Sequence, residues 1–242
     1  RNMTVGESAM HRVSMGVRPI RTRLAVTLVA YGALALVTCL LAPLVGSTTI
    51  SLSRAFDRSI PFADNVDAQI FFVARLPRVM AGALVGAAFA SAGVVLQALL
   101  RNPLATPFTL GVSAGAALGA ILSITFGAAL TLGPLLPVPL ASFAGAFCSA
   151  AIVYAIATRP GRPISTSVLL LAGVTLNSFF SALILFVQYM GEFAETYRGL
   201  RWLMGDLDVG GFGPILSALP LIVIAFVIFA LLSSSLNVLS VG

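Results

Sequence analysis

Long runs of apolar residues alternate with short polar stretches along this chain. A helix needs about 20 apolar residues to cross the roughly 30 Å hydrocarbon core of a bilayer. Six runs approach that length and predict six membrane-spanning helices: Leu24–Val45, Val79–Leu100, Leu110–Phe126, Leu136–Ala157, Ser167–Met190 and Ile215–Leu232. The third run is the shortest, and bordering glycines leave its ends the least defined.

The polar connections differ in length and therefore predict different structures. Residues 46–78 form a long loop in which SLSRAF and AQIFF favour two short helices at the membrane surface. Residues 101–109 form a tight turn with two prolines, which predicts that the second and third spans are antiparallel neighbours. Residues 191–214 are long enough for a short amphipathic helix, with Tyr197 and Trp202 suited to the interface.

The composition supports the same class of protein. Of the 242 residues, 59% are hydrophobic and 9% are charged, whereas a soluble domain carries about 25% charged residues. The mean hydropathy is +1.04. We therefore predict an all-α polytopic membrane protein. Cys39 and Cys148 lie within predicted spans, so we interpret them as small buried residues and not as a disulfide or a metal pair.

The basic residues predict topology. The net charge is +6 and the pI is near 10.4, but the arginines lie at the ends of apolar runs, which argues against nucleic acid as a partner. Positive charge favours the cytoplasmic side of a membrane. With a cytoplasmic N-terminus, eight arginines lie inside and six outside, the inside set being Arg1, Arg12, Arg18, Arg21, Arg23, Arg101, Arg159 and Arg162.

This orientation divides the chain into two regions. Residues 1–23 form a basic cytoplasmic tail, and residues 24–242 form a transmembrane domain. The chain begins with Arg and stops directly after an apolar run. We therefore expect the transmembrane domain to be incomplete.

The predicted spans lack ionisable residues in their interiors. No Asp, Glu, Arg or His lies there. Carriers driven by protons or ions usually place such residues within the membrane, and a metal site would need a cluster of His, Cys or carboxylate ligands. The pattern therefore argues against proton coupling and predicts neither a metal site nor a cofactor.

A G-x-S-x-G sequence lies at the start of the third predicted span. Gly111, Ser113 and Gly115 match this pattern, which holds the nucleophile in some hydrolases. A serine needs a paired base to act as a nucleophile, and His11, the only histidine, lies in the N-terminal tail. We therefore expect no catalytic residue. With no lysine there is no Walker A sequence, so any ATP would be bound by another subunit.

Residues 75–119 are the most distinctive stretch, reading RLPRVMAGALVGAAFASAGVVLQALLRNPLATPFTLGVSAGAALG. Small residues spaced four apart let helices approach closely in a bilayer. This spacing predicts helix packing at Gly82, Gly86, Gly111, Gly115 and Gly119. We expect Gln97 to make an interhelical hydrogen bond, because a buried amide needs a partner. Lining an internal pathway is the alternative for Gln97.

The order of RLPR, a Gly/Ala-rich helix with one Gln, NPLATP and LGVSAGA closely resembles the FecCD-type permeases. These are the membrane subunits of bacterial ABC importers for ferric siderophores, haem and cobalamin. The resemblance implies ten spans in two inverted halves, of which this chain would hold the first half and the sixth span.

The resemblance also implies partners and a location. They are a second permease subunit, cytoplasmic ATP-binding subunits and an extracytoplasmic substrate-binding protein, all acting at the bacterial inner membrane. The function implied is passage of a ferric siderophore or a related metal chelate through the membrane, without covalent chemistry. An ATP-independent secondary transporter or channel is the alternative.

Arg75 and Arg78 flank Leu-Pro at the predicted outer end of the second span. In the family, arginines of this motif form salt bridges with glutamates of the binding protein, so the resemblance implies a docking role for both. Arginine suits such contacts because its planar fork binds carboxylates bidentately. Interfacial anchoring is the alternative.

One face of the fifth predicted span carries mostly small and polar residues, namely Gly173, Asn177, Ser181, Ile184 and Gln188. The family's fifth span lines the central pathway, so the resemblance implies that Gly173, Asn177, Ser181 and Gln188 line it here. Ordinary interhelical packing is the alternative. The resemblance also implies that the segment 158–167 narrows the cytoplasmic exit. A simple tight loop is an equally consistent interpretation of this segment.

Overall fold

The computed structural model describes residues 20–127, 138–158, 165–207 and 209–241, and within them helices are the only regular structure. Five helices are long and apolar enough to cross a membrane: Arg21–Leu44, Val66–Leu100, Val138–Ala157, Thr166–Met190 and Gly213–Val238. The prediction of an all-α protein with several membrane spans is confirmed. The described residues divide into two compact units, one up to Met80 and one from Ala81 onward.

The third predicted span is shorter than the apolar pattern suggests. Leu110–Phe126 is helical only as α6, Val112–Phe126, a helix of 15 residues. The reason is Gly111, whose φ of +70° lies in the left-handed region and cannot continue an α-helix. At 1.5 Å per residue, α6 is roughly 22 Å long, less than the hydrocarbon core.

The first unit opens with α2, Ile20–Leu41, which runs into the single 3₁₀ turn η1, Ala42–Leu44. None of the residues in the apolar window of this helix is buried within the protein. A helix that is apolar on every side and not covered by protein is typical of a membrane span.

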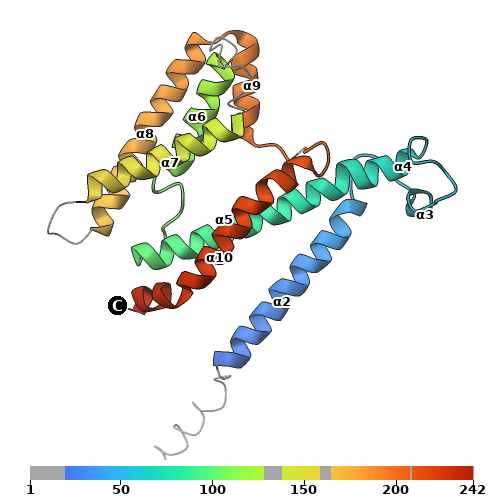
Figure 1. Ribbon diagram of the computed structural model, residues 1–242, viewed down its shortest axis with the longest axis horizontal. Coiled ribbons are helices and arrows are strands. Elements are labelled where there is room, and N and C mark those ends of the chain that lie inside the picture. The colour runs from blue at the N-terminus through green and yellow to red at the C-terminus, as the bar shows by residue number, and fades with distance from the viewer. Residues whose placement is uncertain (1–19, 128–137, 159–164, 208, 242) are drawn as a thin grey trace, which may run out of the picture. The chain divides into compact units, whose positions relative to one another are not determined.

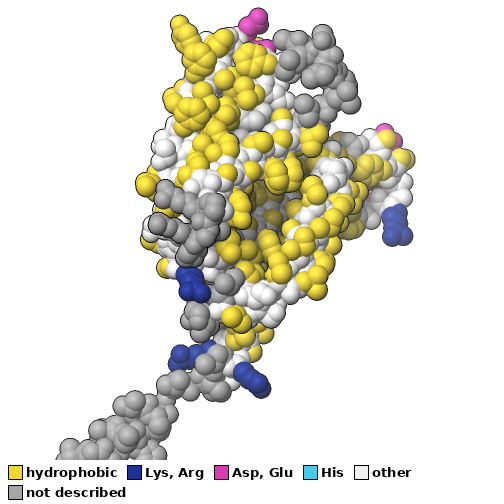
Figure 2. Space-filling view, turned by 60° about the vertical axis from the view of Figure 1, so that its left-hand side comes forward, with side chains coloured by type: hydrophobic (Ala, Val, Ile, Leu, Met, Phe, Trp, Pro, Cys, Tyr) yellow, Lys and Arg dark blue, Asp and Glu magenta, His cyan; other side chains and the backbone are white. Residues whose placement is uncertain are grey.

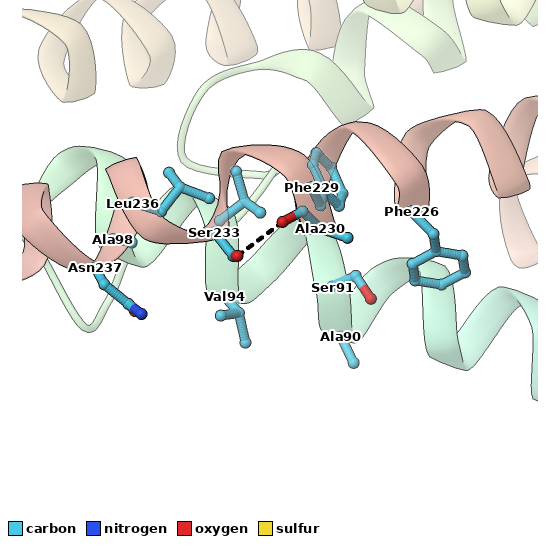
Figure 3. A pocket seen from close by; sticks show the side chains of 11 residues that line it. Ala90, Ser91, Val94, Ala98, Phe226, Phe229, Ala230, Ser233, Leu236 and Asn237 are labelled. Atoms are coloured by element: carbon cyan, nitrogen blue, oxygen red, sulfur yellow. Dashed lines mark hydrogen bonds between the residues drawn. The ribbon is translucent and has the colours of Figure 1, made fainter.

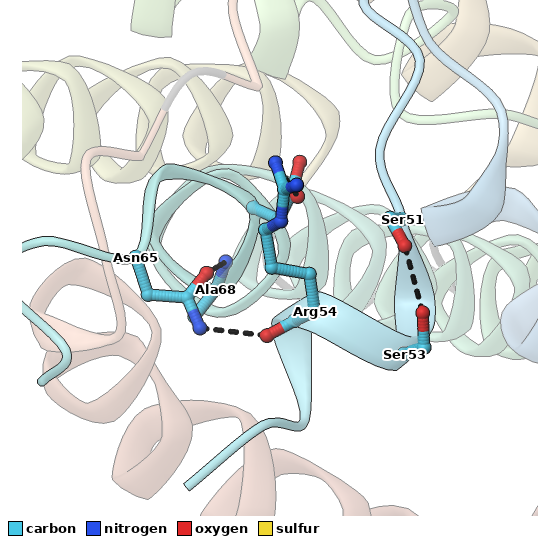
Figure 4. Close-up of polar contacts among 6 residues, drawn as sticks. Ser51, Ser53, Arg54, Asn65 and Ala68 are labelled. Carbon is cyan, nitrogen blue, oxygen red and sulfur yellow. Dashed lines mark hydrogen bonds and ion pairs between the residues drawn. The ribbon is translucent and has the colours of Figure 1, made fainter. Parts of the chain in front are cut away.

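The loop after the first span is an ordered structure. It contains α3, Leu52–Ala55, and ends at α4, Val66–Gln69. Asn65 is buried and caps α4, since its Oδ1 accepts a hydrogen bond from the Ala68 amide at 3.0 Å. Its Nδ2 donates to the Arg54 carbonyl at 2.7 Å, which ties the two short helices together (Figure 4).

Aromatic packing holds this loop against the helix that follows. The ring of Phe56 lies 5.5 Å from that of Phe71 and 5.4 Å from that of Phe72, both at steep angles. Beyond Phe56, Asp57 accepts hydrogen bonds from the hydroxyl and the amide of Ser59. These bonds stabilise the carboxylate and lower the pKa of Asp57.

The second span begins earlier than the apolar pattern predicts. The helix α4 continues through a π-helical stretch η2, Ile70–Arg75, into α5, Leu76–Leu100. The result is one helical stretch of 35 residues, Val66–Leu100, so helix already precedes Arg75 and Arg78. The π turn directly precedes the buried Pro77, where a proline lacks its amide and clashes with an α-helical backbone.

The second unit is built around α6. This helix packs against α7, Val138–Ala157, α8, Thr166–Met190, and α9, Phe193–Met204 (Figure 1). The second and third spans, predicted to be antiparallel neighbours, do not pack closely, because α5 is not among the main contacts of α6, although residues of both line a common cavity. Instead α10, Gly213–Val241, runs beside α5 (Figure 1).

Much of the described surface is apolar. Hydrophobic side chains are spread widely over the face shown in Figure 2, with the charged groups toward its margins. Cys148 is exposed and Cys39 is only partly covered, which corrects the expectation that both are buried. The reason is that an apolar side chain on a membrane span meets lipid and has no need of a protein core. Most of the segment 158–167 and of the N-terminal tail lies outside the described residues.

Candidate functional site

Helices α6 and α7 cross with their backbones almost in contact. A Cβ atom on Gly115 would lie 2.6 Å from both the Gly145 carbonyl oxygen and the Ser149 Cβ. A Cβ on Gly119 would collide with the carbonyl oxygen of Ala141. No side chain fits at these glycines, so the small residues determine where α6 lies. The regular spacing of Ala141, Gly145 and Ser149 is a signal for this crossing that sequence reasoning missed.

The start of α6 is held from two sides. The buried Ser149 hydroxyl donates a hydrogen bond to the Gly111 carbonyl at 2.8 Å. From α8, Gly173 lies so close to the Thr109 carbonyl that a Cβ would not fit. Gly173 therefore packs against the segment leading into α6, which differs from the expectation that it lines a pathway.

A cavity of about 770 Å³ lies along α6, α8 and α9. Four of the five positions on the predicted stripe of α8 line it. The full lining is Phe89, Phe108, Ser113, Ala114, Ala116, Ala117, Asn177, Ser181, Ile184, Leu185, Gln188, Leu200, Trp202 and Leu203. Its volume lies within the range of ligand-binding cavities, roughly 300–1,000 Å³.

The polar groups of this cavity are few and uncharged. The Ser181 hydroxyl donates to the carbonyl of Asn177 in its own helix, at 2.8 Å. The Asn177 carboxamide and the Ser113 hydroxyl make no hydrogen bond within the described residues. The Gln188 Nε2 atom is buried, also without a partner there. The cavity therefore offers unused amide and hydroxyl groups on an apolar wall.

The helix α9 forms one side of the cavity. Its N-terminus carries a capping box. The Glu192 carboxylate accepts a hydrogen bond from the Glu195 amide, and the Glu195 carboxylate accepts one from the Glu192 amide. Gly199 lies against α6 and α8, since a Cβ there would be 2.8 Å from the Ile121 Cδ1 and 3.5 Å from the Gln188 Nε2. The Thr196 hydroxyl donates to the Gln188 carbonyl at 3.0 Å.

The sequence did not lead us to expect that α9 forms part of the cavity wall. The amphipathic helix expected within residues 191–214 is present, but its apolar side lines the cavity through Leu200, Trp202 and Leu203. The alternation of apolar and charged residues from 193 to 204 was the available signal. Tyr197 is exposed, as an interfacial residue would be.

The side chain of Arg75 connects two separate helices of the first unit. Its Nη1 donates to the carbonyl oxygens of Pro43 at 3.1 Å and Leu44 at 3.2 Å, and its Nη2 donates to the carbonyl of Thr48. These carbonyls belong to the end of the first span and the turn after it. They lack helical partners, so the guanidinium acts as their cap. The side chain of Arg78, one turn later, is exposed.

Three positions in α5 differ from expectation. The Gln97 Nε2 donates to the Pro103 carbonyl at 3.0 Å, in the turn that follows its own helix and not on a neighbouring helix. A Cβ on Gly86 would meet nothing within 4 Å, and one on Gly82 would make only ordinary contact with Leu207. These glycines therefore do not form a close helix contact within the described residues.

A second cavity, of about 470 Å³, lies between α5 and α10 (Figure 3). Its serines are already paired, because the Ser91 hydroxyl donates to the Ala87 carbonyl and the Ser233 hydroxyl donates to the Ala230 carbonyl. Its remaining wall is mainly Ala, Val and Phe. It has fewer unused polar groups than the cavity along α8, which is therefore the stronger candidate site.

The described residues contain no group of three or more His, Cys, Asp or Glu side chains that could hold a metal ion. The Ser113 hydroxyl of the G-x-S-x-G sequence lies in the cavity wall. His11 lies outside the described residues, so the structure adds nothing about a base for this serine.

Comparison with known proteins gives consistent matches. Residues 33–242 match the FecCD transport family. The cobalamin import system permease protein BtuC of Halobacterium salinarum is 37% identical over 193 residues, which cover 79% of this chain and 51% of that protein. The ferric enterobactin transport system permease protein FepD of Escherichia coli is 35% identical over 211 residues, covering 86% of this chain and 61% of that protein.

A solved structure also resembles this fold. It is an inward-facing conformation of an ABC transporter that is described as being of the metal-chelate type. It superposes with a TM-score of 0.69 at 29% identity and covers 88% of this chain and 62% of that chain. The chain thus spans between half and two thirds of the length of the relatives it matches.

Proposed function

Because the chain belongs to the FecCD transport family, we propose that it is part of the membrane permease of a binding-protein-dependent ABC importer. The cargo is a ferric siderophore or a related metal chelate. The observation that carries this proposal is the uncharged cavity along α8, which a bulky cargo can enter without being held tightly.

The permease works with other subunits in this proposal. A second permease subunit faces the first across the pathway, two cytoplasmic subunits bind ATP, and an extracytoplasmic protein delivers the cargo. The N-terminus is cytoplasmic and the location is the inner membrane of a bacterial cell. ATP changes which side of the membrane the pathway opens to, through the different affinities of the partners for the two states.

Docking of the binding protein uses the arginines near the outer end of the second span. Arg78 is exposed and suits a carboxylate of the binding protein. Arg75 has five N–H groups, of which three bond to carbonyls of its own chain. Two N–H groups remain for a carboxylate, so docking and capping share one side chain.

The test is transport by the full-length protein, reconstituted in liposomes with its ATP-binding subunit and binding protein. We expect uptake of a labelled ferric chelate or cobalamin only when ATP is inside and the binding protein is outside. Uptake that proceeds without ATP would overturn the importer and favour a secondary transporter or channel. A chelate-independent hydrolytic activity lost in Ser113→Ala would instead indicate a membrane hydrolase.

A further inference from the structure

The wall of the cavity along α8 has properties that bear on the charge of the ligand it accepts. All the residues found in its wall are uncharged, and none of them is Arg, Lys, Asp or Glu. A strongly charged ligand would lose hydration on entering such a cavity and find no opposite charge to replace it. A ligand without net charge would lose much less, so the cavity favours neutral molecules.

Two carboxamides in the same wall lack partners. The Asn177 side chain makes no hydrogen bond within the described residues, and the Gln188 Nε2 is buried without an acceptor. A buried polar group such as the Gln188 Nε2 normally has a partner, and an exception calls for an explanation such as a ligand. The missing partner of an amide N–H is an oxygen with a lone pair.

Both carboxamides belong to α8, about three helical turns apart. Eleven residues separate them, which is roughly 16 Å along a helix axis. Gln188 lies near the end of α8 beside α9, and Asn177 lies beside the start of α6. Gln188 lines the cavity while its Nε2 is buried, so rotation about its side-chain bonds would be needed to bring the amide to a ligand.

We propose that Asn177 and Gln188 are the polar contacts of the cargo, and that this cargo is a chelate without net charge that displays amide or hydroxamate carbonyl oxygens. This inference rests on the proposed import function. Gln188 is the contact nearer the outer side and Asn177 the deeper one. The two residues select against anionic chelates, such as tricatecholate or citrate complexes, because neither amide supplies a positive charge.

The test is equilibrium binding to the full-length permease assembled with its ATP-binding subunit in nanodiscs, without the binding protein. The probes are a radiolabelled neutral ferric trihydroxamate and a radiolabelled anionic ferric tricatecholate. We expect the trihydroxamate to bind at least tenfold more tightly. Gln188→Leu and Asn177→Leu should each weaken its binding about five- to tenfold, the loss of one hydrogen bond.

Two further variants make the result specific. Gln188→Glu keeps the size of the side chain but replaces the N–H donor with a carboxylate oxygen, so it should bind the trihydroxamate at least as weakly as Gln188→Leu. Ser178→Ala is the matched control, since its hydroxyl bonds to the Val174 carbonyl of its own helix and it does not line the cavity. It should bind like the unchanged protein.

The outcomes separate this inference from the import function. Equal binding of the two chelates, or unchanged binding in both Gln188 variants, would overturn the inference while ATP-dependent uptake in liposomes persisted. If the unchanged protein showed no ATP-dependent uptake in liposomes, the proposed function would be overturned instead. The two chelates are compared on the unchanged protein. This comparison can therefore still refute the inference if a variant fails to assemble.

Discussion

The guanidinium of Arg75 lies directly over Gly46. A Cβ atom on Gly46 would be 2.7 Å from both the Cζ and the Nη2 of Arg75, closer than real Cβ contacts allow. The absence of a side chain at residue 46 therefore lets Arg75 reach the carbonyls of Pro43, Leu44 and Thr48. We call this arrangement the Arg75 cap. It fixes the end of the first span against the long helix that holds the second.

The Arg75 cap gives the first prediction. Gly46→Ala should shift the guanidinium and weaken its bonds to the carbonyls, which should lower the stability of the full-length protein by about 1 kcal/mol. Arg75→Lys should have a larger effect, about 1–3 kcal/mol, because an ammonium lacks the planar fork that reaches the three carbonyls. Thermal unfolding in detergent measures both. The control Arg58→Lys, on an exposed side chain of the same unit, should unfold like the unchanged protein; equal losses at both arginines would contradict the cap.

The second prediction concerns docking. Arg78→Glu in the full-length protein should weaken capture of the binding protein, because it replaces an attractive charge with a repulsive one. Assembly with the ATP-binding subunit should be unaffected. Surface-immobilised binding protein measures the association, which should also weaken as salt rises. Unchanged capture by both Arg78→Glu and the double variant Arg75→Glu/Arg78→Glu would contradict the docking assignment.

The third prediction compares two glycines that look alike in sequence. Gly119→Val should destabilise the protein by about 1–3 kcal/mol, because the added methyl groups meet the backbone of Ala141. Gly86→Val should have little effect, since nothing lies within 4 Å of the position where its Cβ would be. The yield of monodisperse protein and its unfolding temperature measure the difference. A larger loss at Gly86 than at Gly119 would mean that α5 and not α6 makes the close helix contact.

The fourth prediction tests the buried hydrogen bond at the start of α6. Ser149→Ala removes the donor to the Gly111 carbonyl and leaves that carbonyl without its partner, at a cost of about 1–3 kcal/mol. Hydrogen exchange of the amides at the start of α6 should become faster than in the rest of the helix. The matched control is Thr175→Ala, whose hydroxyl bonds only to the Leu171 carbonyl of its own helix. Equal exchange in both variants would indicate that the Ser149 bond does not hold the helix start.

Local pattern was enough to identify the class and the family of this protein. Apolar run length alone identifies membrane spans, since the requirement is a number of residues and not a contact. The stripe from Asn177 to Gln188 was visible because a helix places residues four apart on one face, and the structure brings those residues to a cavity. The family could be recognised because residues 75–119 keep polar residues and prolines in a fixed order.

Other features depend on which helices meet, and no periodicity contains that information. Gly86 and Gly119 occur in similar small-residue patterns, yet Gly119 touches a neighbouring backbone and Gly86 does not. The apolar pattern predicts that the second span begins at Val79, but the helix already runs through Pro77 after a π turn. From the sequence Arg75 is interpreted as a docking or interfacial residue, whereas in the structure its guanidinium donates to a carbonyl at the end of the first span. Residue type and spacing decide the elements, whereas the partners of each side chain depend on the close approach of segments far apart in the chain.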